Sequence, residues 1–169
     1  MSPCRRAIRR RMVQIAAELG PQRRVLEIGI AGDDPPGANR EFFHAETYRT
    51  ADMDPALAPD YVLDITALPA SNVGAWDLVI CSQVLEHVWD LEAAARGLWG
   101  LTVLGGVCIV DVPMDYPPHD EQGGGPDYWR IMPTGLKRLL RRAGFGRVEC
   151  WAADDMSANG AVAWKELAR

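Results

Sequence analysis

The sequence has no long apolar run, no paired cysteines and no excess of positive charge, and each absence excludes a class of protein. No stretch approaches the roughly 18 apolar residues that a membrane-spanning helix needs. The four cysteines show no CxxC pair and no metal-ligand spacing, so we expect no metal site. Buried free thiols in a reducing, cytoplasmic setting explain them most simply. A net charge of −5 argues against nucleic acid as a partner.

The length and composition of the chain predict one globular unit. Its 169 residues, 48% of them hydrophobic, suffice for a substantial core but leave little room for an inserted substrate domain. Residues 5–19 have apolar side chains at helical spacing, and Gly20-Pro21 ends that pattern. We therefore expect an N-terminal helix within residues 1–21 and a domain over residues 22–169. The basic N-terminus lacks the apolar core and cleavage site of a secretory signal.

The segment Val25–Gly32 carries the most information about function. An apolar run typical of a buried parallel strand contains Glu27 near its end and is followed by Gly29 and Gly32. Glycines at this point allow a ligand to approach the backbone closely. A carboxylate in this position would repel phosphates but suits an ammonium group. The segment therefore favours S-adenosylmethionine over NAD.

Acidic residues also end the next two expected strands. Asp52 ends the second, where Rossmann-like sheets place a carboxylate that accepts hydrogen bonds from both ribose hydroxyls. Asp54 is an alternative for the ribose, although it more simply caps the following turn. Asp64 and Ile65 follow the third strand, and Asp64 has the alternative of an ordinary turn aspartate.

These motifs, together with the segment Trp76–Val88 that ends in Leu-Glu-His-Val, resemble the class I S-adenosylmethionine-dependent methyltransferases, in particular their small LEHV branch. The resemblance covers about residues 25–167. It implies S-adenosylmethionine as the methyl donor and S-adenosylhomocysteine as the product. The chain departs from the family pattern at Ala31 and Asp33, where the family usually has glycines.

The resemblance also assigns contacts to the cofactor. The carboxylate of Asp64 would face the adenine amino group, and the turn after the fourth strand would border the methionine end. His87 in that turn has the alternative of packing the turn itself. The expected cofactor-binding residues are Glu27, Gly29, Ala31, Gly32, Asp52, Met53, Asp64, Ile65, Ser82, Gln83 and His87.

Alternating strands and helices predict an α/β fold: a Rossmann-like, seven-stranded, mostly parallel sheet with helices on both faces and an antiparallel last strand. Strands are expected at 24–28, 48–51, 61–63, 77–81, 107–112, 147–151 and 161–165. Helices are expected at 5–19, 39–44, 91–101 and 134–142. Thr134 would cap the last helix, Gly144 would follow its end, and Gly105-Gly106 would turn the chain into the fifth strand.

The long segment after the fifth strand would form the acceptor side. Such a loop in a compact domain is usually functional or disordered. His119 is the expected base by type and position, with His87 as a second catalytic candidate and Asp115, Asp120 and Asp127 as alternatives for the base. The residues expected to contact the acceptor are Asp115, Tyr116, Tyr128, Trp129 and Arg130. Tyr128 and Trp129 have the alternative of pinning the loop, and Arg130 that of pairing with Asp127.

The sequence thus predicts a methyltransferase whose acceptor is a small molecule or a sugar, through a hydroxyl group. One rival is an RNA methyltransferase that uses the arginines of the N-terminal helix, although such a charge run usually only solvates a helix face. Another rival is a protein that binds the cofactor without catalysis. A homo-oligomer is left open.

Overall fold

The computed structural model describes residues 2–30, 37–68, 76–115, 117–118 and 125–166. Five residues with expected or alternative site roles, Ala31, Gly32, Tyr116, His119 and Asp120, lie outside these described residues.

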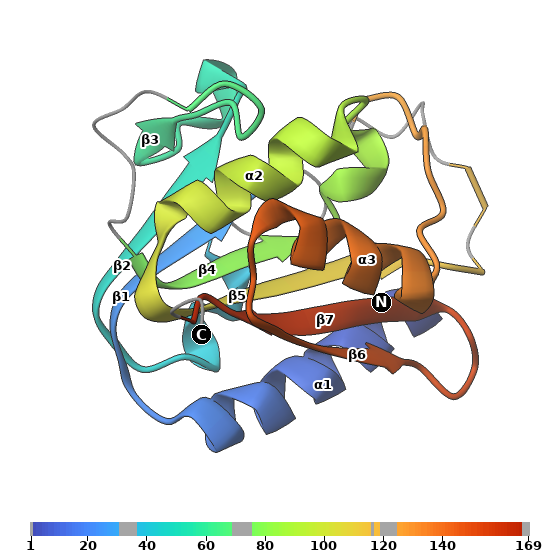
Figure 1. The fold of residues 1–169 in the computed structure, drawn as a ribbon, viewed down its shortest axis with the longest axis horizontal. Coiled ribbons are helices and arrows are strands. Elements are labelled where there is room, and N and C mark those ends of the chain that lie inside the picture. Colours follow the sequence, from blue (N-terminus) through green and yellow to red (C-terminus); the bar gives the residue numbers. More distant parts are fainter. Residues whose placement is uncertain (1, 31–36, 69–75, 116, 119–124, 167–169) are drawn as a thin grey trace.

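Seven strands form one sheet in the order β3-β2-β1-β4-β5-β7-β6 (Figure 1). The strands are β1 (Gln22–Ile28), β2 (Ala45–Asp52), β3 (Tyr61–Val62), β4 (Trp76–Ser82), β5 (Thr102–Pro113), β6 (Arg147–Ala152) and β7 (Ala158–Trp164). Strands β1 to β5 run parallel to one another, and β7 is antiparallel to both β5 and β6. The predicted fold class is therefore confirmed.

Helices cover both faces of this sheet. One face carries α1 (Pro3–Leu19), and the other carries α2 (Leu91–Leu101) and α3 (Pro133–Ala143), as Figure 1 shows. Short 3-10 turns at Ala38–Glu41, Pro55–Leu57 and Leu85–His87 complete the connections. The bounds predicted for α2 agree with the structure, and the connection from β2 to β3 contains the short Pro55–Leu57 turn in place of a full helix.

Two apolar cores, one on each face of the sheet, hold these layers together. Strands β1 and β4 contribute to both cores, because successive strand residues point to opposite faces. On β1 and β4, Leu26 and Val79 belong to the core under α2 and α3, whereas Val25 and Leu78 belong to the core under α1. On β4, Ile80 and Cys81 continue this alternation. Strands buried on both faces explain why the sequence shows continuous apolar runs rather than alternating ones.

Two local predictions are wrong. Strand β5 begins at Thr102 rather than after Gly105-Gly106, and its pairing with β4 shifts register between Trp76 and Leu78. Gly105 has φ +82°, so the pair accommodates an irregularity within the strand rather than preceding it. Helix α3 begins at Pro133, with Met132 as its N-cap and no side-chain cap, because proline is favoured in the first turn of a helix.

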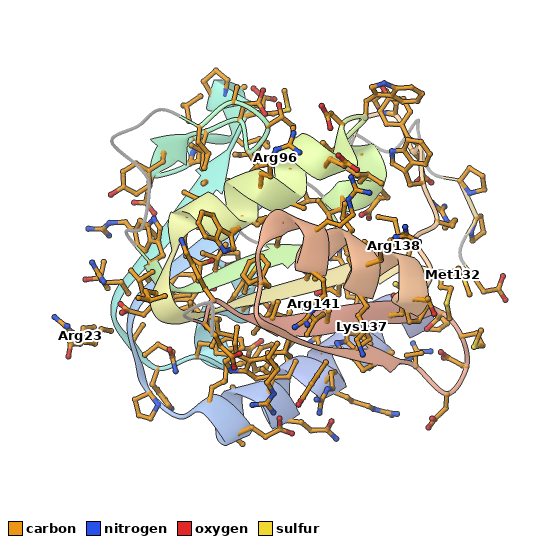
Figure 2. The ribbon with its side chains drawn as sticks, in the orientation of Figure 1. Arg23, Arg96, Met132, Lys137, Arg138 and Arg141 are labelled. Atoms are coloured by element: carbon orange, nitrogen blue, oxygen red, sulfur yellow. The ribbon has the colours of Figure 1, made fainter. Side chains whose placement is uncertain are left out.

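Basic side chains lie on two helices of this acidic protein. On α1, Arg9 bonds to Glu41 and Arg11 bonds to Glu18, so part of the arginine face is paired within the molecule. The exposed side of α3 carries Lys137, Arg138 and Arg141 (Figure 2). None of the helices in the described part of the chain combines the length and apolar character of a membrane crossing.

Candidate cofactor and acceptor site

The carboxyl ends of β1 and β4 approach each other so closely that one position between them requires glycine. Gly29 has φ +83°, and a Cβ atom there would lie 2.2 Å from Cγ2 of Val84. The sequence predicted that a ligand would approach the backbone closely at Gly29. In the structure the side chain of Val84, from the turn after β4, packs against Gly29. This contact places the Ser82–Gln83 turn beside the loop after β1.

Asp52 reaches from the end of β2 to the same loop. Its Oδ2 accepts a hydrogen bond from the backbone N–H of Ile30 at 2.9 Å, and its Oδ1 accepts one from Asp54 at 2.9 Å. Because each carboxylate oxygen has further acceptor capacity, these bonds orient Asp52 without exhausting it. Asp54 caps the following turn through Ala56, as its alternative role predicted. Met53 beside them is 71% exposed.

Glu27 is buried and already has two side-chain partners. Its Oε1 accepts a hydrogen bond from Nδ2 of Asn39 at 2.6 Å, and its Oε2 accepts one from the Tyr48 hydroxyl at 2.7 Å. Burial and the Glu27 charge raise the pKa of Tyr48, which keeps this hydroxyl protonated as a donor. Glu27 therefore ties β2 and the Ala38–Glu41 turn to β1, and its role toward an ammonium group stays a prediction.

The Asp64–Ile65 pair lies at the edge of α2. Oδ1 of Asp64 accepts hydrogen bonds from the amide and the hydroxyl of Thr66, at 2.8 and 2.7 Å, so the side chain makes the local turn that was its alternative role. Ile65 is buried. A Cβ atom at Gly97 of α2 would lie 1.8 Å from the Ile65 carbonyl oxygen, so helix and loop are in direct backbone contact. Asp64 remains exposed.

Residues from three elements meet beyond β4 and β5. Oδ1 of the buried Asp111 accepts hydrogen bonds from the Ser82 hydroxyl at 2.9 Å and from Nε2 of Gln83 at 3.1 Å. Oε1 of Gln83 accepts from the Cys4 thiol of α1 at 3.5 Å. Burial raises the pKa of Asp111 to about 7, against the effect of these donors. Ser82 and Gln83 are thus brought together, around an acid that the sequence analysis did not identify.

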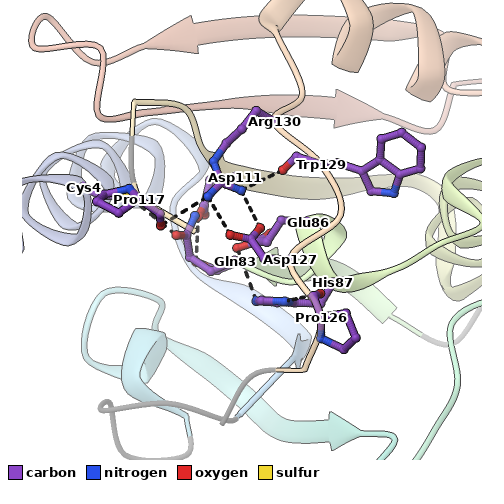
Figure 3. Close-up of polar contacts among 11 residues, drawn as sticks. Cys4, Gln83, Glu86, His87, Asp111, Pro117, Pro126, Asp127, Trp129 and Arg130 are labelled. Atoms are coloured by element: carbon purple, nitrogen blue, oxygen red, sulfur yellow. Dashed lines mark hydrogen bonds and ion pairs between the residues drawn. The ribbon is translucent and has the colours of Figure 1, made fainter. Parts of the chain in front are cut away.

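The segment 125–131, which we call the cover segment, closes over the turn after β4 (Figure 3). The backbone N–H groups of Tyr128 and Trp129 donate to the carbonyl of Glu86, at 2.7 and 3.3 Å. Nε1 of Trp129 donates to the carbonyl of Val88 at 3.0 Å. Nδ1 of His87 lies 2.9 Å from the carbonyl oxygen of Pro126. The pinning role that was an alternative for Tyr128 and Trp129 is present in the structure.

Arg130 pairs with Asp127, as its alternative role predicted. Two guanidinium nitrogens bond to the two carboxylate oxygens of Asp127, whose side chain is fully buried. The same guanidinium also donates to the carbonyl of Trp129. Asp115 is exposed, and its amide donates to the carbonyl of Met156 in the β6–β7 turn. Contacts of Arg130 and Asp115 with an acceptor stay predictions.

Glu86 is the residue of this site whose burial the sequence did not reveal. Its side chain is fully buried, and neither carboxylate oxygen has a hydrogen-bond partner among the described residues. Nε2 of His87 lies 3.9 Å from its Oε1. Burial, with Asp111 and Asp127 adding to it, raises the pKa of Glu86 to about 8. The sequence did contain a signal for Asp111, because it is an acidic residue inside the mainly apolar run of β5. No feature of the sequence indicated that Glu86 would lack a hydrogen-bond partner.

Aromatic rings of the cover segment pack together with the ring of Trp89, which precedes α2. The ring of Trp89 packs against those of Tyr128 and Trp129, with both centroid distances at 5.4 Å. Trp89 is 69% exposed. A hollow of about 370 Å³ lies beside this group, and its lining residues are Trp89, Asp90, Leu91, Glu92 and Trp129. Exposed rings next to a hollow suit a flat or sugar-like molecule.

Comparison with known proteins places this geometry in a known fold. No protein-family model matches the chain. A ubiquinone biosynthesis O-methyltransferase of Psychrobacter arcticus is 30% identical over 99 residues, which cover 50% of this chain and 38% of that protein. This chain thus spans well under half the length of the curated relatives that it matches.

Solved structures resemble nearly the whole chain. The N-methyltransferase NodS from Bradyrhizobium japonicum WM9 superposes with a TM-score of 0.71 at 17% identity and covers 98% of both chains. The 1,6-didemethyltoxoflavin-N1-methyltransferase of Burkholderia thailandensis, solved with bound 1,6-didemethyltoxoflavin and S-adenosylhomocysteine, gives a TM-score of 0.67 at 17% identity over 93% of this chain and 77% of that chain. The strand order, the antiparallel β7 and these similarities together show that this chain has the fold of the class I S-adenosylmethionine-dependent methyltransferases.

Proposed function

We propose that this chain binds S-adenosylmethionine and transfers its methyl group to a small molecule. The observation that carries the proposal is the meeting of Gly29, Asp52 and the Ser82–Gln83 turn beyond the carboxyl ends of β1, β2 and β4. Ligands of open α/β sheets bind at this edge. The oriented carboxylate of Asp52 suits a ribose, and Glu27, Met53, Asp64 and Ile65 would complete the cofactor site with the loop that contains Ala31 and Gly32.

The cofactor, when bound, supplies an activated methyl group, so this chain need only align the acceptor and take up a proton. We propose an oxygen acceptor, a small-molecule or sugar hydroxyl, whose wall is formed by Asp115, Tyr116, Tyr128, Trp129 and Arg130. The exposed rings beside the hollow support a flat or sugar-like acceptor. The resemblance to an O-methyltransferase supports oxygen as the acceptor atom. The free thiols of all four cysteines support a cytoplasmic setting.

Replacing Asp52 by Ala is expected to weaken binding of S-adenosylmethionine by about 1–3 kcal/mol, because the ribose hydroxyls would lose their acceptor. Isothermal titration calorimetry measures the loss. Asp52→Asn keeps an acceptor oxygen for one of the two amides, that of Ile30 or that of Asp54, and turns an NH2 group toward the other, so it tests whether both carboxylate oxygens are needed. Asp54→Ala is the matched control, since its carboxylate caps an exposed turn. Loss in Asp54→Ala with normal affinity in both Asp52 variants would move the ribose contact to Asp54.

Methyl transfer itself is tested by measuring S-adenosylhomocysteine formed with phenolic, sugar and amine acceptors. Turnover with hydroxyl acceptors is the expected result. Turnover with amines alone would place the chain with N-methyltransferases and contradict the oxygen acceptor. Binding of the cofactor without turnover of any acceptor class would favour a non-catalytic cofactor-binding protein.

A further inference from the structure

The buried polar cluster beyond β4 and β5 carries more acidic than basic groups. Glu86, Asp111 and Asp127 contribute three carboxyl groups, and Arg130 contributes one guanidinium, which Asp127 already binds through both oxygens (Figure 3). Both oxygens of Glu86 and Oδ2 of Asp111 have no hydrogen-bond partner among the described residues. Glu86 and Asp111 are each fully buried. The three carboxyl groups thus outnumber the cationic groups that face Glu86, which are Arg130, already bound by Asp127, and His87, whose Nε2 lies 3.9 Å from Oε1 of Glu86.

Glu86 lies in the turn proposed to border the methionine end of the cofactor, and the other residues of the cluster lie around it. Glu86 stands between Gln83 and His87 in the chain, and Asp111 holds Gln83 and Ser82 through its other oxygen. The carbonyl of Glu86 anchors the cover segment, and the Glu86 side chain is fully buried. A charge in such a place acts on its surroundings through a poorly screened field.

A buried carboxylate that accepts no hydrogen bond is costly, and a cation from a ligand is one way to offset that cost. The proposed methyl donor has such a cation, because its sulfur is a positively charged sulfonium. The product, S-adenosylhomocysteine, has a neutral thioether at the same atom. The two molecules therefore differ by the positive charge on sulfur, which is the charge that the carboxyl groups of this cluster would attract.

We propose that the buried carboxyl of Glu86, backed by Asp111, is the counter-charge for the sulfonium of the bound methyl donor and makes the site prefer S-adenosylmethionine to S-adenosylhomocysteine. This inference rests on the proposed cofactor site. Glu86 acts as a specificity-determining residue through its field and needs no contact with the ligand. Loss of the sulfonium charge after transfer removes this attraction, so the same carboxyl favours release of the product.

The proposal predicts how the preference depends on pH. The charged groups that face Glu86 are Asp111 of β5, Asp127 and Arg130 of the cover segment and its neighbour His87, with the Cys4 thiol of α1 nearby. In the free protein the Glu86 carboxyl has a pKa of about 8, so it becomes charged as the pH rises through that value. The preference for the sulfonium form should therefore increase over this range, and binding of the sulfonium should release a proton.

The test measures dissociation constants of both ligands by calorimetry at about pH 6.5 and about pH 8.5, on either side of the Glu86 titration. In Glu86→Gln, the preference for S-adenosylmethionine is expected to fall about tenfold at the higher pH and to lose its pH dependence. Asp111→Asn should give a smaller change in the same direction. The control, Glu149→Gln, makes the same chemical change at a surface carboxylate that pairs with Arg147, and should leave the preference unchanged.

Comparison of variant with wild type at each pH cancels the titration of the ligands themselves. An unchanged preference in Glu86→Gln, with both ligands still bound, would overturn the inference and leave the proposed function standing. If wild type binds neither ligand, the proposed cofactor site is wrong instead. Thermal unfolding of each variant shows that it is folded, which we expect because the amide has the shape of the carboxyl that it replaces.

Discussion

The free energy of unfolding is expected to fall as the pH rises from about 5 to about 8, because Glu86 and Asp111 hold protons in the folded protein that they lose when it unfolds. Burial raises the pKa of Glu86 from 4.5 to about 8 and that of Asp111 from 3.8 to about 7. Between the unfolded and folded pKa values the folded state binds more protons, so the stabilisation is complete below about pH 4 and is lost through about pH 8.

The expected loss is large, at most about 5 kcal/mol for Glu86 alone, since each pKa unit corresponds to about 1.4 kcal/mol. Urea unfolding at a series of pH values measures it. Glu86→Gln should flatten the profile and should be more stable than wild type at the alkaline end, because its amide never becomes charged. Glu149→Gln, a surface substitution, should follow the wild-type profile. Parallel profiles for Glu86→Gln and wild type would show that this carboxyl does not titrate in the folded protein.

The sequence predicted the central strands of the sheet well, because strands buried on both faces appear in the sequence as continuous apolar runs. The apolar runs within β1 and β4 give strands whose two faces belong to two cores. Helix α2 has an apolar face and an aspartate N-cap at Asp90, and its predicted bounds are those observed. Elements set by tertiary contact were less predictable: Gly105 reads as a turn in the sequence but lies inside β5.

The candidate site was only partly predictable for the same reason. The positions of Gly29 and Asp52 follow from where strands end, and the structure brings both to one edge. The partners of Glu27 did not follow, because Asn39 and Tyr48 come from two separate elements. Local sequence likewise does not show that Gly97 touches the backbone of Ile65, or that the buried Glu86 side chain has no hydrogen-bond partner among the described residues. These facts depend on packing between distant segments.

The two histidines that the sequence offers as catalytic candidates are expected to have different roles. His87 is part of the folded framework, since its Nδ1 contacts the Pro126 carbonyl and its Nε2 lies near Glu86. His119 lies outside the described residues, in the segment after β5 that would form the acceptor wall. We propose His119 as the base that accepts the hydroxyl proton of the acceptor, and His87 as a residue that positions the cover segment.

His119→Ala is therefore expected to lower turnover by about 10²–10⁴-fold, the range for loss of a general base, while leaving the affinity for S-adenosylmethionine nearly unchanged. His87→Ala should instead raise KM for the acceptor more than it lowers kcat, because the cover segment would lose an anchor. Steady-state kinetics with a hydroxyl acceptor found by the turnover measurement, together with calorimetry of the cofactor, distinguishes the two. A loss near tenfold in His119→Ala would indicate orientation only, with proximity supplying most of the rate. Normal turnover in that variant would reject His119 as the base and direct attention to His87 or to Asp115, Asp120 and Asp127.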